Sequence, residues 1–85
     1  MQEYQKMKIM VVDDEADVEL LFRQRFRREI RADKAEFHFA LSGEAALDYL
    51  QRGGAAEIVM ILSDINMPGM NGLELLRNIK ETFPT

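Results

Sequence analysis

Three aspartates stand at or just beyond the ends of two short apolar runs of this chain. Asp13 and Asp14 follow residues 8–12, and Asp64 follows residues 58–62 with one serine between them. Short apolar runs rich in β-branched residues are typical of strands buried on both faces of a parallel sheet. Ligand sites in such sheets lie beyond the carboxyl ends of the strands. We therefore expect these three carboxylates to converge, although about fifty residues separate them.

Convergent carboxylates repel one another, and two unit charges about 4 Å apart cost roughly 4 kcal/mol at an effective dielectric of about 20. Such a cluster persists when a divalent cation neutralises it or when a carboxyl group keeps its proton. Hard oxygen ligands, with no imidazole or thiolate nearby in the sequence, favour Mg²⁺, or Mn²⁺ in its place, over zinc. Mg²⁺ leaves positions for phosphate oxygens, and a carboxylate can be the nucleophile of phosphoryl transfer. Asp64 is the natural nucleophile because it stands alone after its apolar run.

The spacing of apolar residues around these aspartates predicts alternating strands and helices. The expected elements are strands over residues 8–12, 35–41 and 58–62, and helices over about 15–31, from 42 to 51, and from 71 to a stop at 82–84. The βαβαβα order predicts parallel strands with right-handed crossovers and helices on both faces. The unbroken run 58–62 should be the most buried strand. His38 lies in an alternating segment and should be an exposed edge-strand residue.

Local signals also predict where the helices begin and end. The predicted caps are Asp14 with Asp17 and Ser42 at helix starts, a capping box of Asn71 and Glu74, and Gly53 with Gly54 at a helix end. Side-chain oxygens at these starts can accept hydrogen bonds from free backbone N–H groups, and glycine tolerates the left-handed conformation that follows many helices.

Composition limits the function classes. The chain has 85 residues, 47% of them hydrophobic, which suits one domain or part of one. A net charge of -4 lacks the basic footprint of nucleic-acid binding, so we expect no direct nucleic-acid contact. The main basic group is Arg23, Arg25, Arg27, Arg28 and Arg31. These arginines come late in a predicted helix, where cations compensate the helix dipole.

The chain shows neither a run of about 18 apolar residues nor a cleavable leader, so we expect no membrane span and no signal peptide. It has no cysteine, which fits a soluble, cytoplasmic protein. Residues 1–7 show no periodicity and are expected to be a leader ahead of the domain, which we assign to residues 8–85.

Three stretches taken together are more specific than any single residue. Residues 11–15 (VVDDE), 40–47 (ALSGEAAL) and 61–72 (ILSDINMPGMNG) closely resemble the receiver domains of two-component response regulators. The resemblance runs from about Lys8 to Thr85, as a partial receiver domain. It implies a flavodoxin-like (CheY-like) doubly wound parallel sheet with strand order 2-1-3-4-5, of which this chain would hold the βαβαβα N-terminal portion.

The resemblance also implies roles for individual residues. Asp64 would be the phosphoacceptor. Asp14 would bind the metal ion directly, Asp13 would act on it largely through water, and Asn66 would bind it through its backbone carbonyl. The loop that holds this carbonyl in place would contain Pro68, Gly69 and Gly72. The chain would then be a signalling domain and not an enzyme. A histidine kinase or phosphotransfer protein would donate the phosphoryl group, docking near Val18 and Leu21.

Receivers continue beyond the third helix, so the family's Ser or Thr after the fourth strand and Lys after the fifth have no counterpart before Thr85. An alternative is therefore a receiver-like interaction module that is never phosphorylated. A third interpretation, an aspartyl-phosphate hydrolase of the dehalogenase-like type, requires an Asp-x-Asp nucleophile motif that residues 13–17 do not provide. Without a fourth strand, the strand over 58–62 would lie at an open edge and could form a homodimer or a swapped oligomer.

Overall fold

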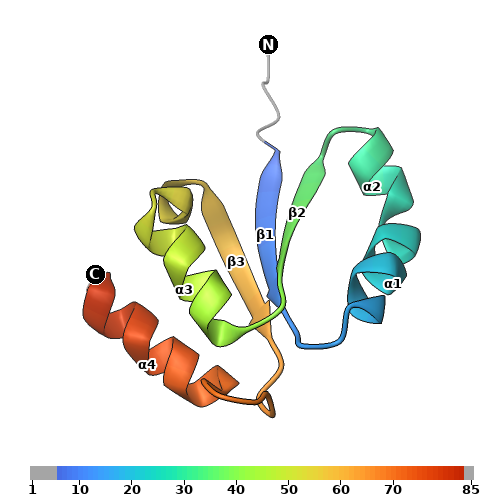
Figure 1. The fold of residues 1–85 in the computed structure, drawn as a ribbon. Helices are drawn as coiled ribbons and strands as arrows, with labels where there is room; N and C mark the ends of the chain where they lie inside the picture. The colour runs from blue at the N-terminus through green and yellow to red at the C-terminus, as the bar shows by residue number, and fades with distance from the viewer. Residues whose placement is uncertain (1–5, 84–85) are drawn as a thin grey trace.

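The computed structural model describes residues 6–83, which form a parallel sheet with helices on both faces (Figure 1). The elements are β1 (Met7–Val12), α1 (Asp17–Arg25), α2 (Arg27–Arg31), β2 (Ala35–Ala40), α3 (Gly43–Gln51), a 3-10 turn (Gly54–Ala56), β3 (Ile58–Ser63) and α4 (Gly72–Thr82). The strand order is β2-β1-β3, with β1 parallel to both neighbours. This arrangement confirms the expected flavodoxin-like order for the strands described. The leader predicted over residues 1–7 lies mostly outside the described residues, and Met7 already belongs to β1.

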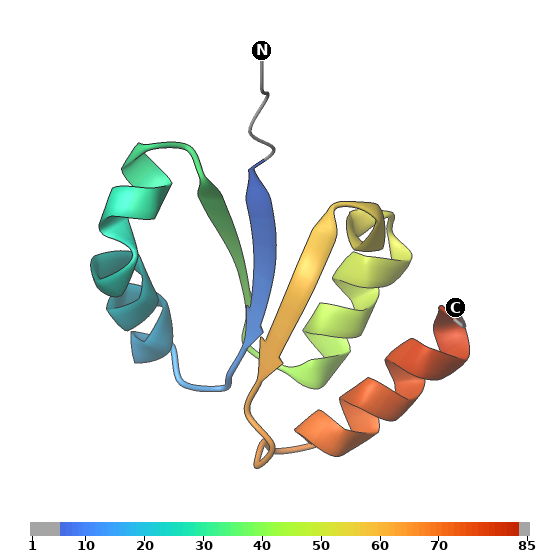
Figure 2. The same ribbon diagram turned by 180° about the vertical axis from the view of Figure 1, so that it is seen from behind.

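The main core lies between the sheet and the helices α3 and α4, which cover the face opposite α1 and α2 (Figure 2). Met10 and Val12 of β1 are fully buried there, together with Ala46 and Leu50 of α3 and Leu75 of α4. Successive strand residues point to opposite faces, so Met10 and Val12, two residues apart in β1, face the same core. Among the described residues, no helix has the length and apolar character needed to cross a bilayer.

An aromatic cluster fills the other face. Phe22 and Phe26 of the helical segment pack against Phe37 and Phe39 of β2, with Phe26 and Phe37 ring centroids 5.4 Å apart. The prediction of one helix over residues 15–31 is wrong, because the helix breaks at Phe26, where φ is -110° and ψ is 23°. No glycine or proline marks the break. Phe26 leaves helical geometry, and its ring packs against Phe22 and Phe37 in this cluster, a tertiary contact that local propensity does not include.

The first helix also begins without the predicted cap. Its N-cap residue is Ala16, which makes no side-chain cap hydrogen bond. The Glu15 N–H instead donates to Asp13 Oδ1 (2.9 Å). The other caps are confirmed, since the Ala45 N–H donates to Ser42 Oγ (3.0 Å) and Gly53 has a φ of 105°.

The strand β3 is less buried than its sequence predicts. Val59 is 63% exposed, Met60 46% and Leu62 40%, so the expectation that this would be the most buried strand is wrong. The cause is its position, because β3 is the last strand of the described sheet and pairs with β1 alone. An apolar run predicts that a strand is buried, but it does not identify the element that buries it. Among residues 6–83, the outer edge of β3 has no strand partner, as expected.

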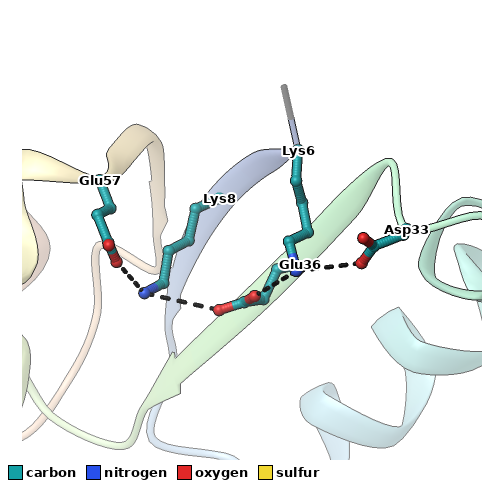
Figure 3. A network of polar contacts seen from close by, with 5 residues as sticks. All are labelled: Lys6, Lys8, Asp33, Glu36 and Glu57. Carbon is teal, nitrogen blue, oxygen red and sulfur yellow. Dashed lines mark hydrogen bonds and ion pairs between the residues drawn. The ribbon is translucent and has the colours of Figure 1, made fainter. Parts of the chain in front are cut away.

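Ion pairs connect the amino ends of the strands (Figure 3). Lys8 of β1 reaches Glu57 before β3 (2.7 Å) and Glu36 of β2 (3.6 Å). Lys6 contacts Asp33 and Glu36, both at 3.1 Å. The hydrogen bond from Lys6 is the main cause that lowers the pKa of Glu36. This network lies at the end of the sheet opposite to the strand tips that carry the aspartates.

His38 is half-buried, not exposed as expected. Its ring stacks on Tyr49 of α3 with centroids 3.7 Å apart. Strand alternation places His38 opposite to Phe37 and Phe39, on the face that α3 covers. Burial lowers the pKa of His38, and the charge of Lys8 lowers it further, while Glu36 acts in the opposite direction.

The lowered pKa of His38 predicts a pH-dependent stability. The unfolded chain takes up a proton as the pH falls through the ordinary value of 6.5, before the folded chain does. The contribution of His38 to the free energy of unfolding should therefore be fully present above this value and should be lost as the pH falls below it. Urea unfolding at each pH measures the effect. In His38→Phe, which keeps a flat ring against Tyr49, this part of the pH dependence should vanish; an unchanged slope would contradict the assignment.

Candidate functional site

Backbone hydrogen bonds hold the carboxyl ends of all three strands together. The Asp13 N–H donates to the Ala40 carbonyl of β2 (3.0 Å), and the Asp64 N–H donates to the Val12 carbonyl of β1 (2.9 Å). The β1–β3 register pairs Val12 with Ser63, so both strands end at the same level. The first aspartates and Asp64 therefore emerge side by side from the sheet.

Asp13, Asp14 and Asp64 form the aspartate cluster that the sequence predicts. Each offers a carboxylate oxygen that lies within 4.8 Å of the others. Asp13 and Asp64 are half-buried, and Asp14 is exposed. Within residues 6–83 none of the three forms an ion pair with a lysine or arginine, so no cationic side chain offsets their charges there.

One oxygen of each half-buried aspartate is oriented by the backbone two residues further on. Asp13 Oδ1 accepts from the Glu15 N–H (2.9 Å), and Asp64 Oδ1 accepts from the Asn66 N–H (3.3 Å). Oδ2 of both residues is then the freer oxygen. An accessible set of hard oxygens with excess negative charge fits Mg²⁺, which takes few protein carboxylates and retains waters.

The loop after Asp64 returns closely on its own start. The Gly72 N–H donates to the Ile65 carbonyl (3.0 Å), and a Cβ on Gly72 would collide with the backbone of Asp64 and Ile65. Gly69 has a φ of 71°, a conformation that favours glycine. Glycine therefore fits both positions of this tight loop, whereas a role of the two glycines in holding the Asn66 carbonyl stays a prediction. Pro68 and Asn66 are exposed, and ligation by the Asn66 carbonyl stays a prediction.

The structure adds two loop contacts that sequence reasoning missed. Met67 is buried in the main core, and the Met70 N–H donates to Glu44 Oε2 at the start of α3 (3.3 Å). The apolar character of Met67 was a signal for the first contact, whereas no local pattern links Glu44 to a loop so far along the chain. The loop ends in the predicted capping box, in which the Glu74 N–H donates to Asn71 Oδ1 (2.8 Å) and Glu74 Oε1 accepts from the Asn71 N–H (3.2 Å).

Fold and site together define a doubly wound α/β domain with an acidic cluster at the tips of two adjacent parallel strands, where the order of strands reverses. The family model of the response regulator receiver domain matches residues 9–85. The chain therefore belongs to the response regulator receiver domain family, a family of signalling domains.

Curated relatives agree with this assignment. The transcriptional regulatory protein ResD of Bacillus subtilis is 39% identical over 86 residues, which cover all of this chain and 32% of that protein. The DNA-binding transcriptional regulator NtrC of Proteus hauseri is 36% identical over 81 residues, covering 95% of this chain and 16% of that protein. The chain thus spans a third or less of the length of these relatives.

Solved structures share the fold. A receiver domain protein from Clostridium thermocellum matches with a TM-score of 0.71 and 28% identity, covering 92% of this chain and 58% of that one. The receiver domain of Ssk1 from Saccharomyces cerevisiae, crystallised with the histidine phosphotransfer protein Ypd1, matches with a TM-score of 0.74 at 18% identity. That match covers 95% of this chain and 51% of the other, and it supports the fold alone.

The aspartate cluster predicts a gain in stability when one charge is removed. In metal-free buffer, Asp64→Asn should raise the free energy of unfolding by on the order of 1 kcal/mol, because like-charge repulsion falls while Oδ1 can still accept from Asn66. Mg²⁺ bound at the aspartate cluster would stabilise the folded wild type, so its addition should shrink the difference. Urea unfolding with chelator and with Mg²⁺ measures both effects.

Asp48→Asn is the matched control. Asp48 is exposed on α3 and pairs with Arg52 (3.0 Å), so its neutralisation should bring no gain in stability and no response to Mg²⁺. If the two variants behaved alike, repulsion within the aspartate cluster would not be the cause.

Proposed function

We propose that Asp64 accepts a phosphoryl group from a histidine kinase or a phosphotransfer protein. Mg²⁺ would be held by Asp13, Asp14, Asp64 and the backbone carbonyl of Asn66, with Mn²⁺ able to replace it. The observation that carries the proposal is the convergence of three carboxylates within 4.8 Å at adjacent strand tips, in a chain that belongs to the receiver family. The phosphoryl group would serve as a signal, and we propose a cytoplasmic location, which fits a chain without cysteine.

The hydrogen bonds at Asp64 suggest which oxygen reacts. Oδ1 is engaged by the Asn66 N–H, so the freer Oδ2 is the proposed nucleophile. Its lone pair forms the new bond to phosphorus as the phosphorus–nitrogen bond of the donor phosphohistidine breaks, and the electron pair of that bond returns to the imidazole nitrogen. When bound, Mg²⁺ supplies positive charge that offsets the negative charge of the transferring group.

Phosphoryl acceptance is tested with beryllofluoride, which mimics a phosphoryl group on an aspartate. Addition with Mg²⁺ should shift the amide resonances of residues 64–72 in a ¹H–¹⁵N correlation spectrum, because a ligand on Asp64 changes the hydrogen bonds of this loop. Asp64→Asn should abolish the shifts, and Asp48→Asn should retain them. Shifts that persist in Asp64→Asn, or their absence in the wild type, would favour the alternative of a receiver-like interaction module.

We further propose that, in the 85-residue chain, the open edge of β3 pairs with β3 of a second copy. The edge leaves backbone N–H and C=O groups without strand partners on its outer side among the described residues, and Val59, Met60 and Leu62 expose apolar surface beside them. A free apolar edge of this kind is a template for pairing with another strand. Such pairing would satisfy the backbone groups and remove the apolar side chains from water.

Self-association should depend on charge at this edge. The wild type should sediment with a mass that rises with concentration, whereas Val59→Lys should remain a monomer because a lysine on an edge strand disfavours pairing. Leu20→Lys alters a comparably exposed apolar residue on α1 and should leave association unchanged. A wild type that stays a folded monomer at high concentration would refute the pairing.

A further inference from the structure

The start of α3 lies directly against the loop that follows Asp64. Gly43 is buried, and a Cβ on it would lie 3.0 Å from the Met70 carbonyl oxygen and 3.1 Å from the Met70 Cβ. One residue on, Glu44 Oε2 accepts a hydrogen bond from the Met70 N–H (3.3 Å). A Cβ on Gly69 would lie 2.9 Å from this same oxygen. The Glu44 carboxylate therefore lies alongside the outer part of the loop and binds its backbone.

Other contacts fix both ends of this loop, and in its later part the Met70 side chain packs against the main core and its Sδ accepts a hydrogen bond from Asn78 Nδ2 (3.5 Å), so Glu44 is the restraint on the Met70 backbone. Near the start, the Asn66 N–H donates to Asp64 Oδ1, and Met67 is 7% exposed in the main core. At the end, the Gly72 N–H donates to the Ile65 carbonyl. Between these points Pro68 and Gly69 are exposed, and the Met70 backbone turns toward α3.

We propose that Glu44 is a positioning residue for the Asp64 site. By accepting from the Met70 N–H it restrains the loop that begins at Asp64 and contains Asn66, and so keeps the Asp64 carboxylate and the Asn66 carbonyl in place for a divalent cation. The effect of Glu44 on cation binding rests on the proposed function. The contact between Glu44 and the loop can be tested without it.

Two other roles of a glutamate at this position give different mutational patterns. A carboxylate in the first turn of a helix interacts favourably with the positive end of the helix dipole, and this stabilisation requires the negative charge. A carboxylate near the aspartate cluster also adds to its negative field, which again needs the charge. A hydrogen-bond acceptor for Met70 needs only an oxygen, which glutamine supplies. Glu44→Gln therefore separates positioning from both electrostatic roles.

The experiment titrates Mg²⁺ into the full 85-residue chain and follows the amides of residues 64–72 by ¹H–¹⁵N spectroscopy. Hydrogen exchange of the Met70 amide is measured in parallel. Glu44→Ala should raise the Mg²⁺ dissociation constant by about threefold to tenfold, the usual effect of losing one hydrogen bond, and should accelerate Met70 exchange. Glu44→Gln should match the wild type in both measurements. Asp48→Ala, which removes a carboxylate one turn further along α3, should change neither.

The proposal is overturned if Glu44→Ala leaves the Mg²⁺ affinity unchanged, or if Glu44→Gln and Glu44→Ala change it equally. A wild type that binds no Mg²⁺ would remove both the proposed function and the role of Glu44 at a cation site. Met70 exchange distinguishes the two failures. Fast exchange in Glu44→Ala with wild-type exchange in Glu44→Gln would still support the contact with the loop, whereas exchange unaffected by Glu44→Ala would exclude it.

Discussion

The parallel pairing of β3 with β1 is the constraint on which the site depends. The hydrogen bond from the Asp64 N–H to the Val12 carbonyl sets the register at the strand tips and brings three like charges within 4.8 Å of one another. A shift of one residue would turn Asp64 toward the opposite face of the sheet. Ile58 and Ile61 of β3 pack against the main core and oppose such a shift, because the side chains of β3 would change faces together with Asp64. Core packing therefore stabilises the arrangement that the repelling carboxylates disfavour.

Local patterns were sufficient to predict much of this arrangement. The apolar runs ending in aspartate indicated the strands and the convergence of Asp13, Asp14 and Asp64, since parallel strands place their carboxyl ends at one edge. The caps at Ser42 and Asn71 were predictable because the acceptor and its N–H lie within three residues of each other. The strand order itself came from the resemblance to receivers and not from periodicity.

The features that could not be predicted depend on contacts between distant segments. The helix breaks at Phe26, whose ring packs against β2, and β3 is exposed because it lies at the edge of the described sheet. The alternating pattern around His38 indicated a surface residue, but α3 covers its face. The hydrogen bond between Glu44 and Met70 joins positions 26 residues apart. In each case the residue type was compatible with several environments, and the tertiary fold selected one.

The two ends of the sheet differ in how their charges are balanced. At the amino end, the carboxylates of Glu36 and Glu57 are matched by Lys8, whereas the carboxyl end presents the aspartates without a cationic side chain among the described residues. The negative potential at the carboxyl end of the sheet attracts cations and would repel a phosphorylated donor. Under the proposed function, an incoming dianion would meet an electrostatic barrier at this end of the sheet unless a bound cation already offset the aspartate charges, so the cation would have to bind before the donor.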